Sequence, residues 1–160
     1  YFDPELIVLK EILSNQIPGL VILLISLSLG FILADTKLWA LLLLPFIWFL
    51  LLLFIIGIGL MLSLVNLIAK DIENSLGIFI MLVTFLSPYA YTPQMVPSAL
   101  KIVLYLNPLS YYVLVNQQII VYGVFPEVKL LLGTIIISFV TIFLGVKCFS
   151  ISKKLFSDYV

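Results

Sequence analysis

The residue types best suited to holding a polar ligand are concentrated in one window of the chain. Six of the eight tyrosines lie there, namely Tyr89, Tyr91, Tyr105, Tyr111, Tyr112 and Tyr122. Aromatic faces offer contact area to sugar C–H groups, and phenol hydroxyls hydrogen-bond to sugar hydroxyls. Tyrosine also favours the headgroup level of a bilayer, so an interfacial aromatic belt is the alternative interpretation. Both interpretations stay open, and different tyrosines can follow different ones.

Covalent chemistry has few candidate residues in this sequence. The chain contains neither Arg nor His, its eight Lys are balanced by eight acidic residues, and Cys148 is the single cysteine. Without His, the commonest proton shuttle and metal ligand are missing, and one cysteine cannot form an internal disulfide. A neutral chain without Arg lacks the basic stripe that nucleic-acid binding requires. We therefore expect no catalytic residues, no metal site and no nucleic-acid partner.

The composition places the chain in a membrane. Of its 160 residues, 64% are hydrophobic and 10% are charged, and the mean hydropathy is +1.31. Soluble domains contain about 25% charged residues, so this chain has too few charges to cover a water-exposed surface. Disorder is excluded because so apolar a chain can bury more surface than its ordering costs. An integral membrane protein is the class that remains.

Uncharged stretches locate the membrane segments. They are residues 12–34, 38–69, 74–100, 102–126 and 130–146, the last enclosed by Lys129 and Lys147. A helical span needs about 20 mostly apolar residues to cross about 30 Å of hydrocarbon. Prolines interrupt the third and fourth stretches, and non-helical backbone at membrane depth survives only where protein or water covers it. We therefore predict one all-α transmembrane domain over residues 1–160, with four full spans and a re-entrant helix pair at about 95–122, hinged at Asn107-Pro108.

The lysines give this arrangement an orientation. Four crossings put both ends of the chain on one side, which would hold Lys10, Lys70, Lys147, Lys153 and Lys154, against Lys37, Lys101 and Lys129 on the other. Because cytoplasmic loops carry an excess of lysine and arginine, this bias predicts cytoplasmic ends. The tail reads as a short amphipathic segment that could rest on anionic lipid.

Two further features have open interpretations. Gly59 and Ser63 are spaced as small residues that let helices approach closely, either within the subunit or at a dimer seam. The charged loop at 66–74 is either a solvated turn or a contact for a cytoplasmic partner. Since no span contains an acidic pair or another ionisable group that could drive transport, a transporter built from this chain must draw its energy from another protein.

Several segments, taken in order, resemble a known family. Residues 1–6, 57–72, 87–110 and 149–160 are similar to the membrane subunit of type-two ABC exporters, most closely those that export O-antigen, capsule or teichoic acid. The family usually has Arg where this chain has Lys70. Because lysine cannot pair with a carboxylate through two parallel hydrogen bonds as arginine does, this difference weakens any such pairing with a partner. By this resemblance, the family's N-terminal helix and first span are absent from the fragment.

The resemblance implies a role for each region. A cytoplasmic ATPase subunit, which binds the ATP, would contact Asn66, Lys70, Asp71 and Glu73. The exit and gate would be formed by Tyr89, Tyr91, Tyr105, Asn107, Pro108, Tyr111 and Tyr112. Two copies would form one channel in the cytoplasmic membrane for a lipid-linked glycan. The chain itself would need no cofactor and would catalyse no covalent reaction.

Three alternatives remain at this point. The first is an ABC exporter whose cargo is a drug, lipid or peptide. The second is a membrane scaffold or assembly subunit that transports nothing. The third is a membrane enzyme, which would need catalytic residues outside this fragment.

Overall fold

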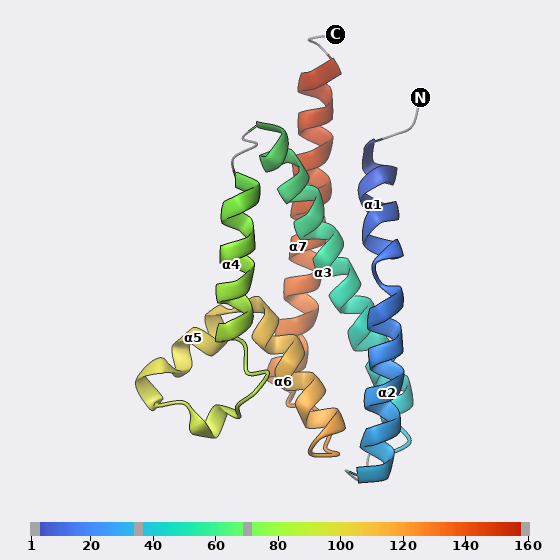
Figure 1. Ribbon diagram of the computed structural model, residues 1–160, viewed down its shortest axis with the longest axis vertical. Helices are drawn as coiled ribbons and strands as arrows, with labels where there is room; N and C mark the ends of the chain where they lie inside the picture. The colour runs from blue at the N-terminus through green and yellow to red at the C-terminus, as the bar shows by residue number, and fades with distance from the viewer. Residues whose placement is uncertain (1–3, 34–36, 69–71, 158–160) are drawn as a thin grey trace.

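Every regular element in the described part of the chain is helical, which confirms the all-α class. The computed structural model describes residues 4–33, 37–68 and 72–157 (Figure 1). The α-helices are α1 (Pro4–Ser14), α2 (Ile17–Leu33), α3 (Ala40–Ile68), α4 (Ile72–Leu86), α5 (Lys101–Leu106), α6 (Pro108–Ile120) and α7 (Val128–Ser157), with short 3-10 helices η1 (Pro93–Met95) and η2 (Ser98–Leu100).

The helices run up and down a common axis. In Figure 1, α1 and α2 follow one another down the bundle, α3 returns, α4 descends again, and α7 runs back over the full length. The rings of Trp39 and Phe125, which precede α3 and α7, are 5.7 Å apart, so these two helices start together and run parallel. The start of α1 and the end of α7 therefore lie at the same end of the bundle, where α3 finishes and α4 begins.

Within residues 4–33, 37–68 and 72–157, three helical segments are long and apolar enough to cross a membrane. They are Val8–Ile32, which includes the α1–α2 junction, Leu42–Asn66 and Val128–Ser152. The fourth predicted crossing is shorter, because α4 has 15 residues, or about 22 Å at 1.5 Å per residue. Since about 30 Å of hydrocarbon must be crossed, the count of four full spans stays a prediction.

The helices extend further than the charge-free stretches predicted. The helical segment begins at Pro4 rather than at residue 12, and α7 continues to Ser157 rather than ending near Lys147. A charge ends the part of a helix that sits in hydrocarbon, but it does not end the helix, because lysine stems reach toward water. Pro45 lies inside α3, which continues through it. Pro18 lies in the first turn of α2, where proline removes no helical hydrogen bond.

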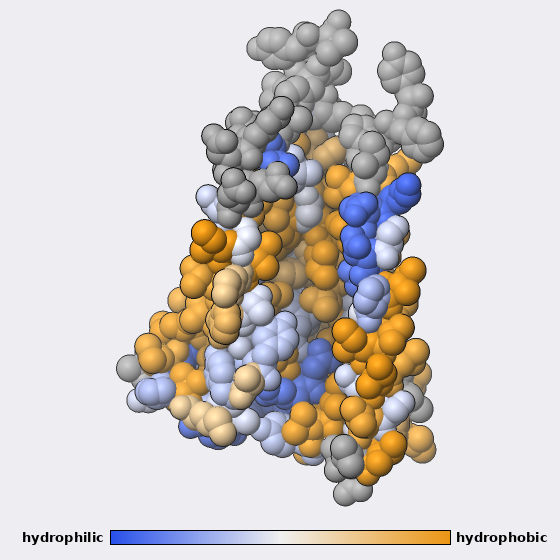
Figure 2. All heavy atoms as spheres, in the orientation of Figure 1, coloured by the Kyte–Doolittle hydropathy of each residue, from blue (hydrophilic) through white to orange (hydrophobic). Residues whose placement is uncertain are grey.

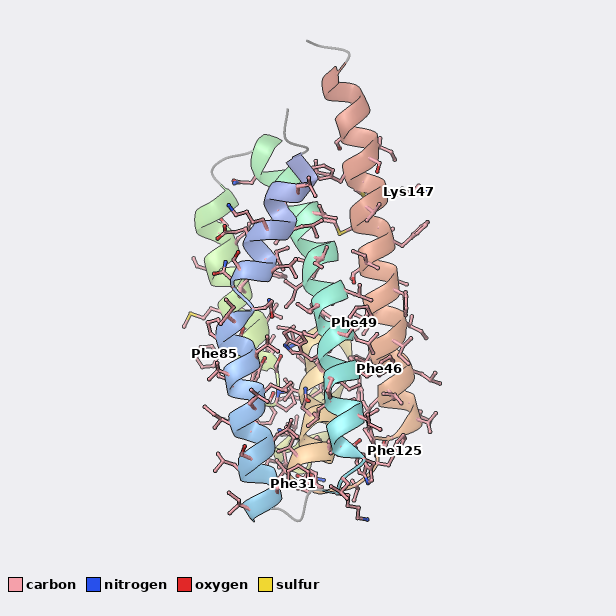
Figure 3. The ribbon with its side chains drawn as sticks, turned by 90° about the vertical axis from the view of Figure 1, so that its right-hand side faces the viewer. Phe31, Phe46, Phe49, Phe85, Phe125 and Lys147 are labelled. Atoms are coloured by element: carbon pink, nitrogen blue, oxygen red, sulfur yellow. The ribbon has the colours of Figure 1, made fainter. Side chains whose placement is uncertain are left out.

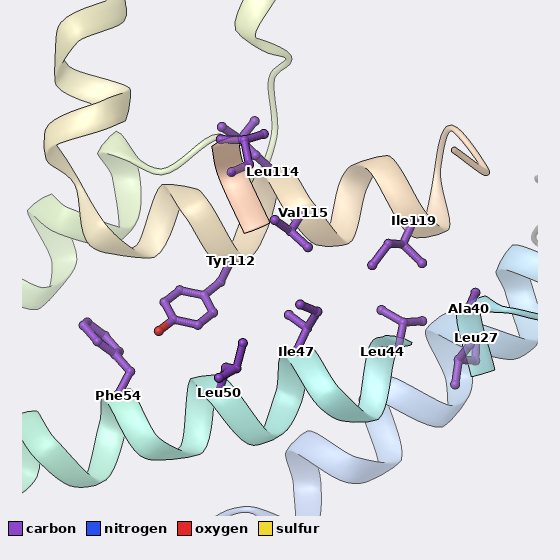
Figure 4. Packing of buried hydrophobic residues seen from close by; sticks show 11 residues of the cluster. Leu27, Ala40, Leu44, Ile47, Leu50, Phe54, Tyr112, Leu114, Val115 and Ile119 are labelled. Atoms are coloured by element: carbon purple, nitrogen blue, oxygen red, sulfur yellow. The ribbon is translucent and has the colours of Figure 1, made fainter. Parts of the chain in front are cut away.

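The core is formed mainly where α6 lies along the first half of α3. Figure 4 shows Leu44, Ile47, Leu50 and Phe54 of α3 facing Tyr112, Val115 and Ile119 of α6, and all seven are buried. Residues three and four apart share one face of a helix. The two helices are antiparallel, because Tyr112 lies at Phe54 and Ile119 lies near Leu44. The start of α6 is therefore level with the middle of α3.

A crossing between glycines joins α3 to α7. A Cβ atom on Gly57 would collide with backbone atoms of Thr141, and one on Gly145 would collide with the backbone of Gly57. Helix pairs in membranes pack closely where small residues face each other. Gly59 faces Ile12 of α1, so it also packs within the subunit. These contacts hold the first, second and last long segments together.

Large apolar side chains cover much of the outer surface. Figure 3 labels Phe31, Phe46, Phe49, Phe85 and Phe125, all of which are exposed and come from α2, α3, α4 and the turn before α7. Near the far end of α7, the Lys147 ammonium lies 5.9 Å from the centre of the Phe143 ring. This surface suits contact with lipid, where apolar side chains cost nothing to expose.

The crossing between Gly57 and Gly145 predicts that alanine has different effects on stability at two glycines. Gly57→Ala should destabilise the fold by about 1–3 kcal/mol, because the added methyl group has no space. Gly77→Ala is the matched control, since nothing lies within 4 Å of its Cβ position, and alanine there should be neutral or stabilising. The measurement is the unfolding midpoint of the purified protein in mixed micelles with increasing SDS. Equal shifts for the two variants would contradict the crossing.

Candidate functional site: the helix pair around Asn107 and the polar surface of α6

The predicted hinge is a hydrogen-bonded joint between α5 and α6. Asn107 has extended backbone angles (φ −83°, ψ 114°), and Pro108 occupies the first turn of α6. The Asn107 side-chain oxygen accepts the Leu109 N–H at 3.0 Å, which caps α6. Its amide nitrogen donates to the Val83 carbonyl at 2.8 Å and to Ser87 Oγ at 2.9 Å. The structure thus has two short helices joined at Asn107-Pro108, as predicted, and the joint is tied to the end of α4. That this pair re-enters the membrane stays a prediction.

The irregular backbone after α4 is satisfied by side chains. Ser87 and Pro88 are buried, and the Gln117 amide nitrogen donates to the Pro88 carbonyl. The Tyr91 hydroxyl donates to the Leu86 carbonyl at 2.7 Å, which is one of the carbonyls left open at the end of a helix. Within an apolar layer, such groups must find partners in the protein. This segment can therefore lie level with the middle of α3 without exposing its polar atoms to lipid.

Tyr112 serves as a packing residue between three helices. It is 3% exposed, its ring centre lies 5.4 Å from that of Phe54 on α3, and its hydroxyl lies 2.6 Å from Ser138 Oγ on α7. Because Ser138 Oγ already donates to the Thr134 carbonyl at 2.7 Å, the Tyr112 hydroxyl is the donor in this pair. The predicted gate residue is thus enclosed by α3 and α7 in this conformation.

Tyr111 is also held by packing, on the neighbouring face of α6. Its ring covers Gly133 of α7 so closely that a Cβ there would collide with it. Its hydroxyl donates to the Tyr105 carbonyl at 3.1 Å, which braces α6 against α5. Pro108 is half-buried in the same joint.

Tyr89 and Tyr105 are placed differently from the packed tyrosines. They are 61% and 54% exposed, and each borders a hollow lined by polar side chains. The window of predicted gate residues therefore contains two kinds of tyrosine. The gating role of all these residues stays a prediction.

The larger hollow lies between α2, α3 and α6 and is called the α6 groove here. It has a volume of about 430 Å³, and Ser26, Leu51, Tyr89, Asn116, Gln117 and Ile120 are among its lining residues. Figure 2 shows hydrophilic residues gathered in the lower centre of this face, between the apolar columns of α4 and of α1–α2. Such a surface can offer hydroxyl and amide groups to a polar ligand at a depth where the flanking surfaces contact lipid.

A second hollow, called the Glu127 cavity here, lies on the other side of Gln117. Its volume is about 290 Å³, and it is bordered by the segment after α4, by α5 and α6, and by the turn that leads into α7. Gln117 lines both hollows, and its side-chain oxygen is buried without a hydrogen-bond partner in the structure. Gln117 therefore lies between the two hollows.

The prediction of site residues left out the polar residues of α6 and the turn after it. The run Asn116-Gln117-Gln118 lies inside the fourth uncharged stretch, and Glu127 is the charge that ends it. The signal was present, because three amide side chains in succession cannot all face lipid at low cost. What the sequence lacked was the turn that brings Glu127 back beside Gln118.

Two of the four predicted coupling residues, Asn66 and Glu73, are described, and they lie at the opposite end of the bundle. Asn66 is exposed in the last turn of α3, and the backbone of Glu73 lies in the first turn of α4. Lys70 and Asp71 fall outside the described residues, as does the side chain of Glu73. Among the residues that the structure describes, no group of three or more His, Cys, Asp or Glu could hold a metal ion.

The capping joint can be tested by removing its side chain. Asn107→Leu should destabilise the fold by about 2 kcal/mol, because α6 loses its cap and the Val83 carbonyl loses a donor. Asn116→Leu is the matched control, since the Asn116 amide donates only within α6, to the Tyr112 carbonyl at 2.9 Å. The SDS-unfolding midpoint measures both. If the two leucine variants have the same SDS-unfolding midpoint, the Asn107 side chain does not stabilise the joint between α4, α5 and α6.

Comparison with known proteins identifies the family. The ABC-2 type transporter family matches residues 2–121. The O-antigen export system permease protein RfbA of Klebsiella pneumoniae is 29% identical over 87 residues, which cover 54% of this chain and 32% of that protein. The match thus spans about a third of the length of this curated relative. No solved structure was found to match the chain.

The family match agrees with the helical architecture. It covers well over half of the 160 residues and extends from α1 to the end of α6. Together with three apolar helical segments of spanning length, it establishes an integral membrane protein. The chain belongs to the ABC-2 type transporter family and is a permease subunit of that type.

Proposed function

We propose that this chain is the transmembrane subunit of an ATP-driven exporter that moves a lipid-linked polysaccharide across the cytoplasmic membrane. The observation that carries the proposal is the similarity to an O-antigen export permease. The polar hollows at one end of the bundle support it, because tyrosine rings and side-chain amides are suited to sugar C–H and hydroxyl groups. O-antigen, capsule and teichoic acid polymers are the cargo classes in question.

The energy for export comes from a partner in this proposal. ABC transporters of this family combine a membrane domain with an ATPase subunit, and α3, the most extensively packed helix, contains no charged residue that could couple transport to an ion gradient. Two permease copies form one channel, and two ATPase subunits drive it between closed and open arrangements. The permease catalyses no covalent reaction and holds no cofactor.

The two ends of the bundle have different roles in this proposal. The end with Asn66, Lys70, Asp71 and Glu73 faces the cytoplasm and meets the ATPase. The end with α5, α6 and the tyrosine-rich segment faces outward and forms the exit. A movement of α3 at its cytoplasmic end would reach the exit through the buried contacts between α3 and α6.

Reconstitution tests the proposed cargo. The full-length permease, combined with its ATPase in proteoliposomes, should move a lipid-linked oligosaccharide only when ATP is present. Lipid-linked glycan should also stimulate ATP hydrolysis more than a cationic drug, a peptide or a phospholipid does. Stimulation by one of those cargoes alone would favour the alternative exporters, and no ATPase in the purified complex would favour a scaffold.

The orientation can be measured with introduced cysteines. In a Cys148→Ser background, Lys37→Cys should react with a membrane-impermeant maleimide in intact cells. Asn66→Cys should react only after permeabilisation, because it lies at the other end of the bundle. Both positions are exposed, so the side of the membrane on which each residue lies, and not burial within the protein, decides whether it reacts. The reversed pattern would place the ends of the chain outside.

The coupling loop can be tested by removing one carboxylate. Asp71→Ala should leave the protein folded and the complex able to hydrolyse ATP, while export falls, because the loop no longer transmits the ATPase movement. Asp35→Ala, which removes a carboxylate from the connection between α2 and α3, is the control and should export normally. Export at the normal rate by the Asp71 variant would remove this loop from the mechanism.

A further inference from the structure

The Glu127 cavity has the side chains of a built ligand site. Six of its lining residues are polar or phenolic and come from four separate segments, namely Gln94, Tyr105, Gln117, Gln118, Tyr122 and Glu127. Its volume of about 290 Å³ equals roughly ten water molecules at about 30 Å³ each. A space of this size and chemistry suits a single small unit that bears several hydroxyl groups.

Two hydrogen bonds donated by backbone N–H groups to Gln118 fix the turn that carries Glu127. The Gln118 side-chain oxygen accepts the Glu127 N–H at 2.8 Å, and the Gln118 carbonyl accepts the Val124 N–H at 3.0 Å. Gly123 has a φ of 60°, a conformation that glycine adopts readily. The chain therefore folds back onto the end of α6, and the cavity wall is set by the fold.

The Glu127 carboxylate gives the cavity a negative charge. No hydrogen bond or ion pair involves this carboxylate among the residues that the structure describes. Lys101 and Lys129, in the first turns of α5 and α7, are exposed and do not line the cavity. The start of α7 contributes about half a positive charge, which offsets only part of the carboxylate. The local field therefore disfavours an anion and favours a hydroxyl donor or a cation.

We infer that the Glu127 cavity is a sugar-binding subsite that accepts a neutral or amine-bearing sugar unit and rejects an acidic one. The inference rests on the proposed function, because it treats the cargo as a glycan. The carboxylate and the glutamine side chains accept sugar hydroxyl protons, and the rings of Tyr105 and Tyr122 cover C–H faces. The negative charge of Glu127 would repel a uronate or phosphate group. This subsite therefore favours non-acidic polysaccharides over teichoic or uronic acid polymers.

Saturation-transfer difference NMR on the purified full-length permease tests this selectivity. The probes are three monosaccharides of similar size, namely glucosamine, N-acetylglucosamine and glucuronate. We expect glucosamine and N-acetylglucosamine to bind at least about tenfold more tightly than glucuronate. Glu127→Gln keeps the shape of the side chain and removes its charge, so it should bring glucuronate close to the other two.

A matched control separates charge at the cavity from charge elsewhere. Glu11 is an exposed carboxylate near the opposite end of the bundle, where it accepts a hydrogen bond from Asn15. Glu11→Gln makes the same chemical change and should leave the three affinities as in the wild type. A similar loss of selectivity in both variants would overturn the inference, because the effect would then come from overall charge.

The remaining outcomes distinguish this inference from the proposed function. Equal binding of all three sugars to the wild type overturns the selectivity but leaves a glycan exporter standing. Binding of none of them, together with ATP-driven transport of lipid-linked glycan in proteoliposomes, shows that the cavity is not a subsite. Binding of none of them without glycan transport overturns both.

Discussion

The structure depends on satisfying backbone polar groups where the chain stops being helical within an apolar bundle. The α4 helix ends at Leu86, level with the middle of α3, and the chain does not resume a long helix until α6. In hydrocarbon, each open carbonyl or N–H would cost several kcal/mol. Asn107 supplies three hydrogen bonds at this level, and Gln117 supplies one more. These amide side chains allow an irregular segment to reach the centre of the molecule.

The same solution creates the polar surface. Asn107, Gln117 and the tyrosines hold the irregular segment, and polar side chains of α6 and its following turn, namely Asn116, Gln117, Gln118 and Glu127, border the hollows beside it. A uniformly helical bundle would have presented apolar side chains there instead. The property that makes the segment costly in a membrane is therefore also the property that provides sites for a hydrophilic cargo.

Close packing joins α3 to α7 on the far side of this arrangement. The α7 helix presents Thr134, Ser138 and Thr141, whose hydroxyls bond to carbonyls of their own helix, so their polar atoms are satisfied and their small size is available for packing. The Gly57–Gly145 crossing then brings α3 and α7 into backbone contact. Because α6 contacts both helices, a shift of α3 relative to α7 would change the contacts of α6 directly.

The sequence by itself determined the membrane class, the helical fold and the joint at Asn107-Pro108. The apolar composition requires a lipid environment. A proline preceded by a capping residue starts a helix through local geometry alone. Only the tertiary structure decided that α4 stops halfway, that Gly57 meets Gly145, that Tyr112 is buried while Tyr89 is exposed, and that Glu127 joins Gln117 at one cavity. Those outcomes depend on contacts between residues far apart in the chain, and a single sequence contains no record of which distant side chains will share a space.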